Sequence, residues 1–139
     1  MTPEKDDEIC KKYPKIFKYR NSSDQRYPIL WGISCGDGWA NIIDNACKLI
    51  QHRCDIVSDK EKKEFQVSAV QIKQKFGTLR FYVTGGDEFT QGIISMAEVM
   101  SSTTCEDCGN YAVTSTDGWW MTQCEKCRSE YLKELNKKT

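Results

Sequence analysis

The spacing of apolar residues predicts two amphipathic helices on either side of a β-hairpin. From residue 39 to about 57, apolar side chains recur every three or four positions, which is the period of a helix. From about 65 to 84 they alternate with polar residues, which predicts a hairpin with one buried face and a bulge near Ala69. The helical period returns from about 87 to 101, where Asp87 is suited to cap the first turn. The pattern therefore predicts an α+β fold, with helices packed on a small antiparallel sheet.

The residues before the first of these helices follow a weaker pattern. Glu4 to Tyr13 are expected to form a short helix that ends at Pro14, because proline disfavours helical geometry in the residue before it. Residues 21–38 are rich in Asn, Ser, Pro and Gly and are expected to form a loop. Asp37 or Gly38 is expected near the N-cap of the helix that follows.

Two cysteine pairs near the end of the chain carry the clearest chemical signal. Cys105 and Cys108 flank two residues, Cys124 and Cys127 flank two more, and fifteen residues separate the pairs. This spacing is typical of a site in which four thiolates bind one zinc ion. Because four thiolates fill a tetrahedral shell and leave no position for water, such a zinc ion is structural and not hydrolytic. Two redox-active pairs are the alternative, but a thioredoxin-like site needs a βαβ unit that the sequence does not predict.

The segments around the cysteines predict a small zinc-binding lobe. Residues 111–114 and 119–122 are expected to form two short strands, and the apolar face of Tyr131, Leu132 and Leu135 predicts a final helix. The order of knuckle, hairpin and helix resembles the treble-clef zinc finger, a relative of the zinc ribbon. The sequence thus predicts a main α+β lobe at residues 1–102 and a zinc-finger lobe with a C-terminal helix at residues 103–139.

Charge and hydropathy narrow the classes of function. Twenty basic residues balance twenty acidic ones, which argues against a protein that coats nucleic acid or membrane by bulk attraction. The chain has no apolar run long enough to cross a bilayer, and its charged first twelve residues lack the apolar core of a signal peptide. We therefore expect a cytoplasmic protein without a membrane partner, in the cytoplasm of the host cell if the source is viral.

The predicted hairpin offers a candidate binding surface. Lys73, Lys75, Arg80 and Tyr82 fall on its polar face and could bind phosphate, nucleic acid or an acidic protein surface. The alternative is an ordinary solvated strand face. The region leading into the cysteines, residues 85–110, contains acidic residues and neither Lys nor Arg, so the charge is polarised.

Tryptophans supply two further candidates. Trp39 ends the sequence Cys35-Gly36-Asp37-Gly38-Trp39, in which the two glycines could shape a ligand pocket or a tight turn that buries the indole. Trp119 and Trp120 fall on a predicted strand, so alternation places one inward and one outward. We expect Trp39 and Trp120 to support binding, with the outward indole anchoring a partner or docking on the main lobe.

The remaining cysteines and the single histidine give no catalytic signature. Cys47 and Cys54 lie on the apolar side of a predicted helix, and with Cys10 and Cys35 they are interpreted as small buried hydrophobic residues. A second metal site and a Cys–His nucleophile pair are the alternatives, although His52 falls on the polar side of its helix. The sequence therefore predicts that the protein is not an enzyme.

Several strings of residues resemble those of small uncharacterised bacteriophage proteins that end in a four-cysteine zinc finger. They are Tyr13-Pro14-Lys15-Ile16-Phe17, Cys35-Gly36-Asp37-Gly38-Trp39, the run from Gln71 to Tyr82, and the two cysteine pairs. The resemblance implies a viral source and an intracellular site of action, and by class alone a role against host antiviral defence. The leading hypothesis is thus a non-catalytic zinc protein that binds a host protein or a small anionic ligand. Nucleic-acid binding through the zinc finger and the basic hairpin is the alternative.

Overall fold

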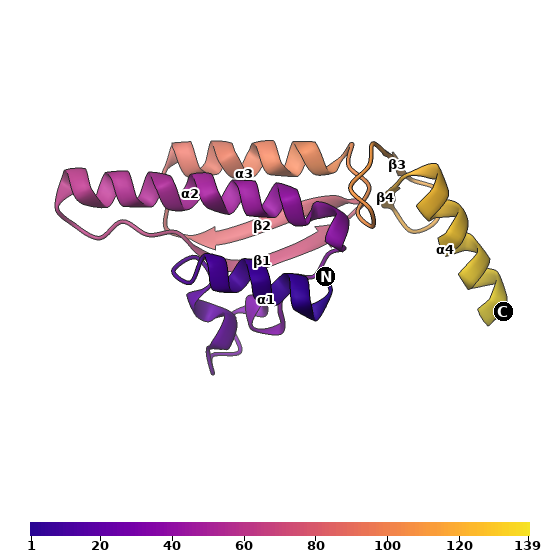
Figure 1. Cartoon of the computed structure of the whole chain (residues 1–139), viewed down its shortest axis with the longest axis horizontal. Coiled ribbons are helices and arrows are strands. Elements are labelled where there is room, and N and C mark those ends of the chain that lie inside the picture. The colour runs from indigo at the N-terminus through magenta and orange to yellow at the C-terminus, as the bar shows by residue number, and fades with distance from the viewer.

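The computed structural model describes residues 1–139 and contains four α-helices and two antiparallel two-stranded sheets (Figure 1). The α+β class is therefore confirmed. The helices are α1 (Pro3–Lys12), α2 (Ala40–Glu61), α3 (Glu88–Ser101) and α4 (Glu125–Lys138). The strands are β1 (Ser68–Lys75), β2 (Thr78–Thr84), β3 (Val113–Ser115) and β4 (Met121–Gln123). Three short 3₁₀ turns precede α2: η1 (Lys18–Asn21), η2 (Pro28–Trp31) and η3 (Asp37–Trp39).

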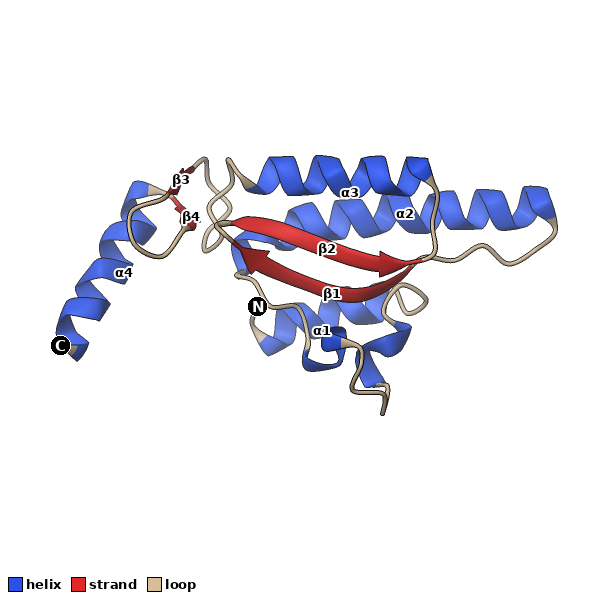
Figure 2. Ribbon diagram, turned by 180° about the vertical axis from the view of Figure 1, so that it is seen from behind, coloured by secondary structure: helices blue, strands red, loops and turns tan.

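The larger hairpin is covered by helices on one face only. Helices α1, α2 and α3 all lie on the same side of β1 and β2, which pass behind α2 in Figure 1 and in front of it in Figure 2. The core between the helices and this face of the sheet is apolar, and its largest fully buried side chains include Trp39, Ile43, Ile50, Ile72 and Leu79. Burial of one such side chain contributes about 1.5–3 kcal/mol. The small sheet and α4 lie at one end of this body, where the four clustered cysteines are consistent with a zinc lobe.

The register of the hairpin agrees with the alternation in the sequence. Ile72 lies opposite Phe81, and the predicted bulge is confirmed by a register shift between Ala69 and Gln71. Both edges of the sheet are covered. Ser34 pairs with the β1 edge, whereas on β2 the backbone N–H of Leu79 donates to the Ser101 hydroxyl at 2.9 Å. Covered edges prevent the hairpin from adding strands of other chains.

A buried ion pair holds the N-terminal layer together. The Asp6 carboxylate accepts hydrogen bonds from the Arg20 guanidinium at 2.9 and 3.1 Å, and from the backbone N–H of Ile33 at 2.8 Å. Arg20 also donates to the carbonyl oxygen of Leu30 at 2.8 Å. Asp6 thereby joins α1, η1 and the segment that leads to the β1 edge.

The caps of the two long helices differ from each other. Asp87 caps α3 as predicted, since its carboxylate accepts from the Thr90 N–H at 3.0 Å. Asp37 and Gly38 lie near the N-cap of α2, as predicted, but the N-cap itself is Trp39 and makes no side-chain capping bond. The Asp37 carboxylate instead accepts from the backbone N–H and the hydroxyl of Thr2, at 2.8 and 2.9 Å. These two hydrogen bonds link the N-terminus to the loop before α2.

Candidate functional site

The four cysteines of the two pairs form one cluster. The Sγ atoms of Cys105, Cys108, Cys124 and Cys127 all lie within 4.8 Å of one another, and those of Cys108 and Cys124 are 3.6 Å apart. A tetrahedron with Zn–S bonds of about 2.3 Å has S–S edges of about 3.8 Å. The cluster can therefore bind one metal ion, as the sequence spacing predicts.

A tight turn positions the first pair. The backbone N–H of Gly109 donates to the carbonyl oxygen of Cys105 at 2.9 Å. The backbone N–H of Cys105 in turn donates to the carbonyl oxygen of Asn110 at 2.7 Å. Gly109 has a φ of +81°, which a residue with a side chain adopts only with strain. Cys105 is fully buried in this turn, so its thiolate is shielded from water when it binds a metal ion.

The second pair opens a helix. Cys124 is the N-cap of α4, and its Sγ accepts a hydrogen bond from the backbone N–H of Cys127 at 3.5 Å. This N–H bond lowers the pKa of the Cys124 thiol to about 7, which favours the thiolate that a metal ion binds. Burial raises the pKa of the Cys127 thiol, so binding of a metal ion to this sulfur displaces its proton to solvent.

The glycine-rich loop before α2 holds the knuckle against the main body. The N–H of Gly38 donates to the carbonyl oxygen of Glu106 at 2.7 Å, and the N–H of Gly36 donates to the Glu106 carboxylate at 3.0 Å. The Trp39 indole N–H donates to the carbonyl oxygen of Thr104 at 2.8 Å. Burial raises the pKa of the Glu106 carboxyl. The loop that the sequence suggested as a ligand pocket is therefore filled by the knuckle, and the fully buried Trp39 has no surface to offer a partner.

Gly38 is required for this close approach, and alanine there is expected to destabilise the protein. A Cβ on Gly38 would lie 2.1 Å from the carbonyl oxygen of Cys105, so one of the two backbones must move. We expect Gly38→Ala to cost about 1–3 kcal/mol, the usual effect of overpacking. Denaturant unfolding measures this loss. Gly92→Ala is the control, because a Cβ on Gly92 meets nothing within 4 Å. A Gly38→Ala protein as stable as the wild type would contradict the prediction.

The hairpin gathers the predicted basic residues on one face. Lys73 lies directly opposite Arg80, and the neighbouring pairs are Gln71 with Tyr82 and Lys75 with Thr78. Lys75 and Tyr82 are exposed, whereas Lys73 and Arg80 are half-buried. None of the three cations forms an ion pair, in contrast to Arg20, Arg26 and Arg53. Like charges opposite one another destabilise a sheet, so this arrangement costs stability unless an anion neutralises it.

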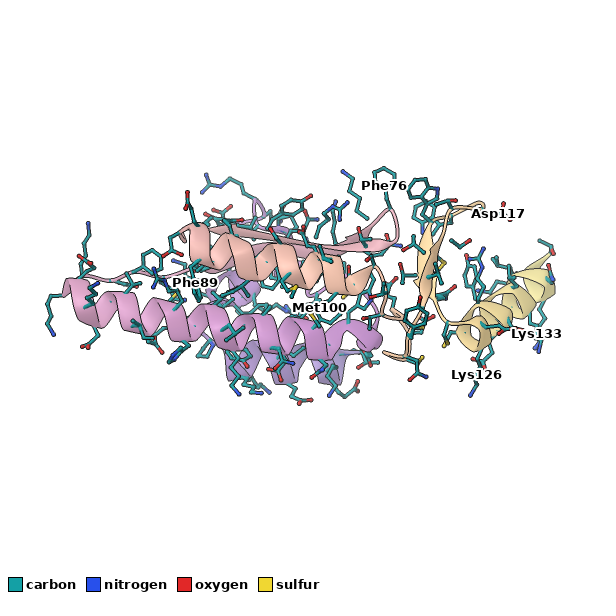
Figure 3. The ribbon with its side chains drawn as sticks, turned by 90° about the horizontal axis from the view of Figure 1, so that it is seen from above. Phe76, Phe89, Met100, Asp117, Lys126 and Lys133 are labelled. Carbon is teal, nitrogen blue, oxygen red and sulfur yellow. The ribbon has the colours of Figure 1, made fainter.

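An aromatic cleft lies where the tip of this hairpin meets the small sheet. Phe76, Trp119 and Trp120 line it together with Gln74, Lys75 and Gly118, and its volume is about 540 Å³. The rings of Phe76 and Trp120 lie edge to face, with centroids 5.8 Å apart. The Gln74 side-chain amide donates to the carbonyl oxygen of Trp120 at 3.0 Å. In Figure 3, Phe76 and Asp117 mark the two turns that approach each other here.

Both tryptophans of this cleft face solvent, so the predicted alternation is wrong. Trp119 is 73% exposed and Trp120 is 44% exposed. The strand begins only at Met121, and both residues therefore belong to the turn between β3 and β4. Trp120 docks on the main lobe through Phe76 and Gln74, which is one of the two outcomes expected for an outward indole.

Phe76 was missed by the sequence reading, although it bears a conformational signal. Phe76 and Gly77 are the two central residues of the hairpin turn, with φ of +53° and +81°. Such turns favour Asn or Asp followed by Gly, and a bulky residue at positive φ is strained. This strained turn places the exposed ring of Phe76 at the cleft. Strained backbone is often associated with functional sites.

The remaining thiols lie in the core. Cys47 and Cys54 are fully buried, and Cys10 and Cys35 are nearly so, in agreement with their interpretation as small hydrophobic residues. His52 is exposed and makes no hydrogen bond with any of them. His52 therefore forms no Cys–His pair with these thiols.

Comparison with known proteins supplies no family. The helices of the chain include none long and apolar enough to cross a membrane. The chain matches no protein-family model, no curated protein and no solved structure.

Proposed function

We propose that this chain is a non-catalytic, zinc-containing binding protein. Its binding surface consists of the basic hairpin face, formed by Lys73, Lys75, Arg80 and Tyr82, and the adjoining aromatic cleft. The observation that carries the proposal is the juxtaposition of three cations that lack acidic partners with three exposed aromatic rings. The like charges on the hairpin and the exposed aromatic rings both lower the stability of the free protein, and a bound ligand would compensate for both costs.

Zinc is the metal that best fits the cysteine cluster. Thiolate ligands select soft or borderline metals, and a tetrahedral set of four sulfurs is typical of zinc or iron–sulfur sites. One knuckle, one short hairpin and one helix bring the four thiolates together, which is the order of a treble clef. In this proposal the ion is structural, since no coordination position remains for a substrate.

The chemistry of the surface indicates an anionic protein partner with an apolar anchor. Carboxylates on the partner would neutralise Lys73 and Arg80, while an apolar side chain would enter the cleft beside Trp119. Tryptophan, tyrosine and arginine dominate the energetics of many protein interfaces, and the surface contains all three. The resemblance to bacteriophage proteins extends this proposal to a protein of the infected host, with antiviral defence as the process affected. A small anionic ligand would use the same cations.

Single-stranded nucleic acid is the second candidate, and the aromatic cleft favours it. Bases stack on exposed aromatic rings while cations follow the phosphates, a combination that needs no sequence readout. Three phosphate contacts to a single strand would give a slope of about −2 in log affinity against log salt. Quenching of tryptophan fluorescence by an oligothymidine of twelve nucleotides, measured at several salt concentrations, tests this candidate directly. A protein partner predicts no quenching by this probe.

Charge reversal at the hairpin is expected to weaken partner binding strongly. The variant Lys73→Glu/Lys75→Glu/Arg80→Glu places like charges against the carboxylates of the partner, which costs several kcal/mol. We expect the affinity to fall on the order of 100-fold, which corresponds to about 2.7 kcal/mol. Partners are captured from expressing cells on the immobilised wild-type chain, identified by mass spectrometry, and then titrated as purified proteins.

The matched control changes the same charge elsewhere. Lys15, Lys60 and Lys63 are exposed and form no ion pair, so their reversal to Glu alters the net charge equally and leaves the hairpin intact. This control is expected to bind like the wild type. Equal affinities for the hairpin variant and the wild type would refute the proposed surface.

A further inference from the structure

An apolar groove lies between α2 and α3 on the surface of the main body. Leu49, Phe89, Met96 and Met100 form its walls, and its volume is about 460 Å³. Met96 is 63% exposed, and Phe89 and Met100 lie toward opposite ends of α3 in Figure 3. Gly92 lies on the floor, where a Cβ would meet nothing within 4 Å. Glycine is the least favourable helix residue after proline, so this position gives up helix stability and leaves the groove open.

Helix α4 presents the complementary surface. It has no buried residue, and its main contacts with the rest of the chain are with β4. Leu132 and Leu135 lie on one helical face and are more than 40% exposed. An isolated helix of this length is only marginally stable in water, so α4 gains from a partner that covers this face.

The chain cannot cover α4 with its own groove. The first turn of α4 carries Cys124 and Cys127, and the cluster therefore fixes the direction of the helix. From there α4 points away from the body, whereas the groove runs along α2 and α3 within the body (Figures 1 and 2). Contact between the two surfaces requires a second copy of the chain.

We propose that two copies exchange their α4 helices, each placing Leu132 and Leu135 in the other's groove. The lengths agree, because α3 and α4 each have 14 residues and thus span about 21 Å. Charge favours one direction. Glu88 begins α3, is exposed and forms no ion pair, and α3 contains no basic residue, whereas Lys137 and Lys138 end α4. An antiparallel arrangement brings these opposite charges together and also opposes the two helix dipoles.

The exchange produces a closed dimer. Each copy contributes one helix and one groove, so the two contacts are related by a twofold axis and no surface remains for a third copy. An amphipathic helix in an apolar groove is a recurrent mode of protein recognition. The hairpin face and the aromatic cleft lie outside both contacts, so this inference does not depend on the ligand proposed above.

Two variants test the exchange on the metal-loaded full chain. Gly92→Leu fills the groove, and since the position is open and leucine favours helix, we expect the monomer to be at least as stable as the wild type. Leu132→Glu places a charge on the exposed α4 face. Sedimentation equilibrium is expected to show a dimer for the wild type at about 50 µM and a monomer for each variant, a weakening of at least 30-fold. Trp31→Glu, which removes an exposed aromatic ring from η2, is the control and should remain dimeric.

Mixing the two variants distinguishes the exchange from other dimers. The Gly92→Leu protein keeps its α4 and the Leu132→Glu protein keeps its groove, so an equimolar mixture is expected to recover one of the two contacts and form a heterodimer. The proposal is overturned if the wild type is a monomer at 200 µM or forms species larger than a dimer. It is also overturned if the Leu132→Glu protein remains a dimer. A mixture that stays monomeric would overturn it as well. Circular dichroism with unchanged helical signal confirms that both variants are folded.

Discussion

Cys105→Ser is expected to lose the bound metal ion and to unfold the segment from about residue 103 to the C-terminus. Cys105 is the fully buried member of the cluster, and three thiolates cannot complete the tetrahedral shell. A few hydrogen bonds join the segment to the main body, but its apolar packing is slight. The main core cluster includes no residue beyond Ala97, and α4 has no buried residue. Structural zinc contributes an apparent 10–16 kcal/mol in small peptides, far more than this lobe gains by packing.

Two measurements check this prediction. Native mass spectrometry should show one metal ion in the wild type and none in Cys105→Ser. Circular dichroism should show the loss of helical signal from α4, with α2 and α3 retained. Cys10→Ser serves as the control, since Cys10 lies in the core of the main lobe, and this variant should keep its metal ion. A metal-bound Cys105→Ser protein would disprove the assignment of the four ligands.

Asp6→Ala is expected to destabilise the main lobe by about 3 kcal/mol or more. The substitution removes the only carboxylate that the Arg20 guanidinium binds, and it leaves the backbone N–H of Ile33 without its acceptor. Loss of one partner from a buried ion pair typically costs 3–5 kcal/mol, because the other charge remains away from water. Asp6 is almost fully buried and Arg20 is largely so, which places the pair in this class.

Thermal and denaturant unfolding measure this effect. For a chain of this size we expect the midpoint temperature to fall by roughly 10 °C. The neighbouring Asp7 is the matched control, because it pairs with Lys11 on the exposed face of the same helix. Exposed ion pairs contribute about 0–1 kcal/mol, so Asp7→Ala should be nearly neutral. Similar losses for the two variants would show that the buried network contributes nothing beyond a surface pair.

The periodicity of apolar residues predicted most of the fold, and the spacing of the cysteines predicted the metal cluster. The alternation around Gly77, the cap at Asp87 and the two cysteine pairs are local signals, each contained within a few residues, and the structure reproduces them. The division into lobes at residues 102 and 103 stays a prediction. So do the binding roles of the hairpin cations.

What the sequence could not show depends on contacts between distant segments. Gly36 and Gly38 meet Glu106 about seventy residues away, and a single sequence does not reveal which backbone a glycine admits. Trp119 and Trp120 were misplaced because β4 starts two residues later than the alternation suggests. Phe76 could have been found, since a phenylalanine before glycine in a two-residue hairpin turn contradicts the usual turn chemistry.

The distribution of thiols divides the molecule into a part that oxidants can attack and a part that they cannot. Burial raises the pKa of the Cys10 and Cys35 thiols to about 12, and it raises those of Cys47 and Cys54 as well, so these four are not thiolates at neutral pH. Cys108 is exposed, and Cys124 has a lowered pKa. Oxidation depends on thiolate character and access to solvent, and Cys124 of the metal cluster is the one thiol that combines a lowered pKa with partial exposure. Peroxide would therefore eject the metal ion and leave the packed core reduced, so that oxidative damage begins at the C-terminal end of the chain.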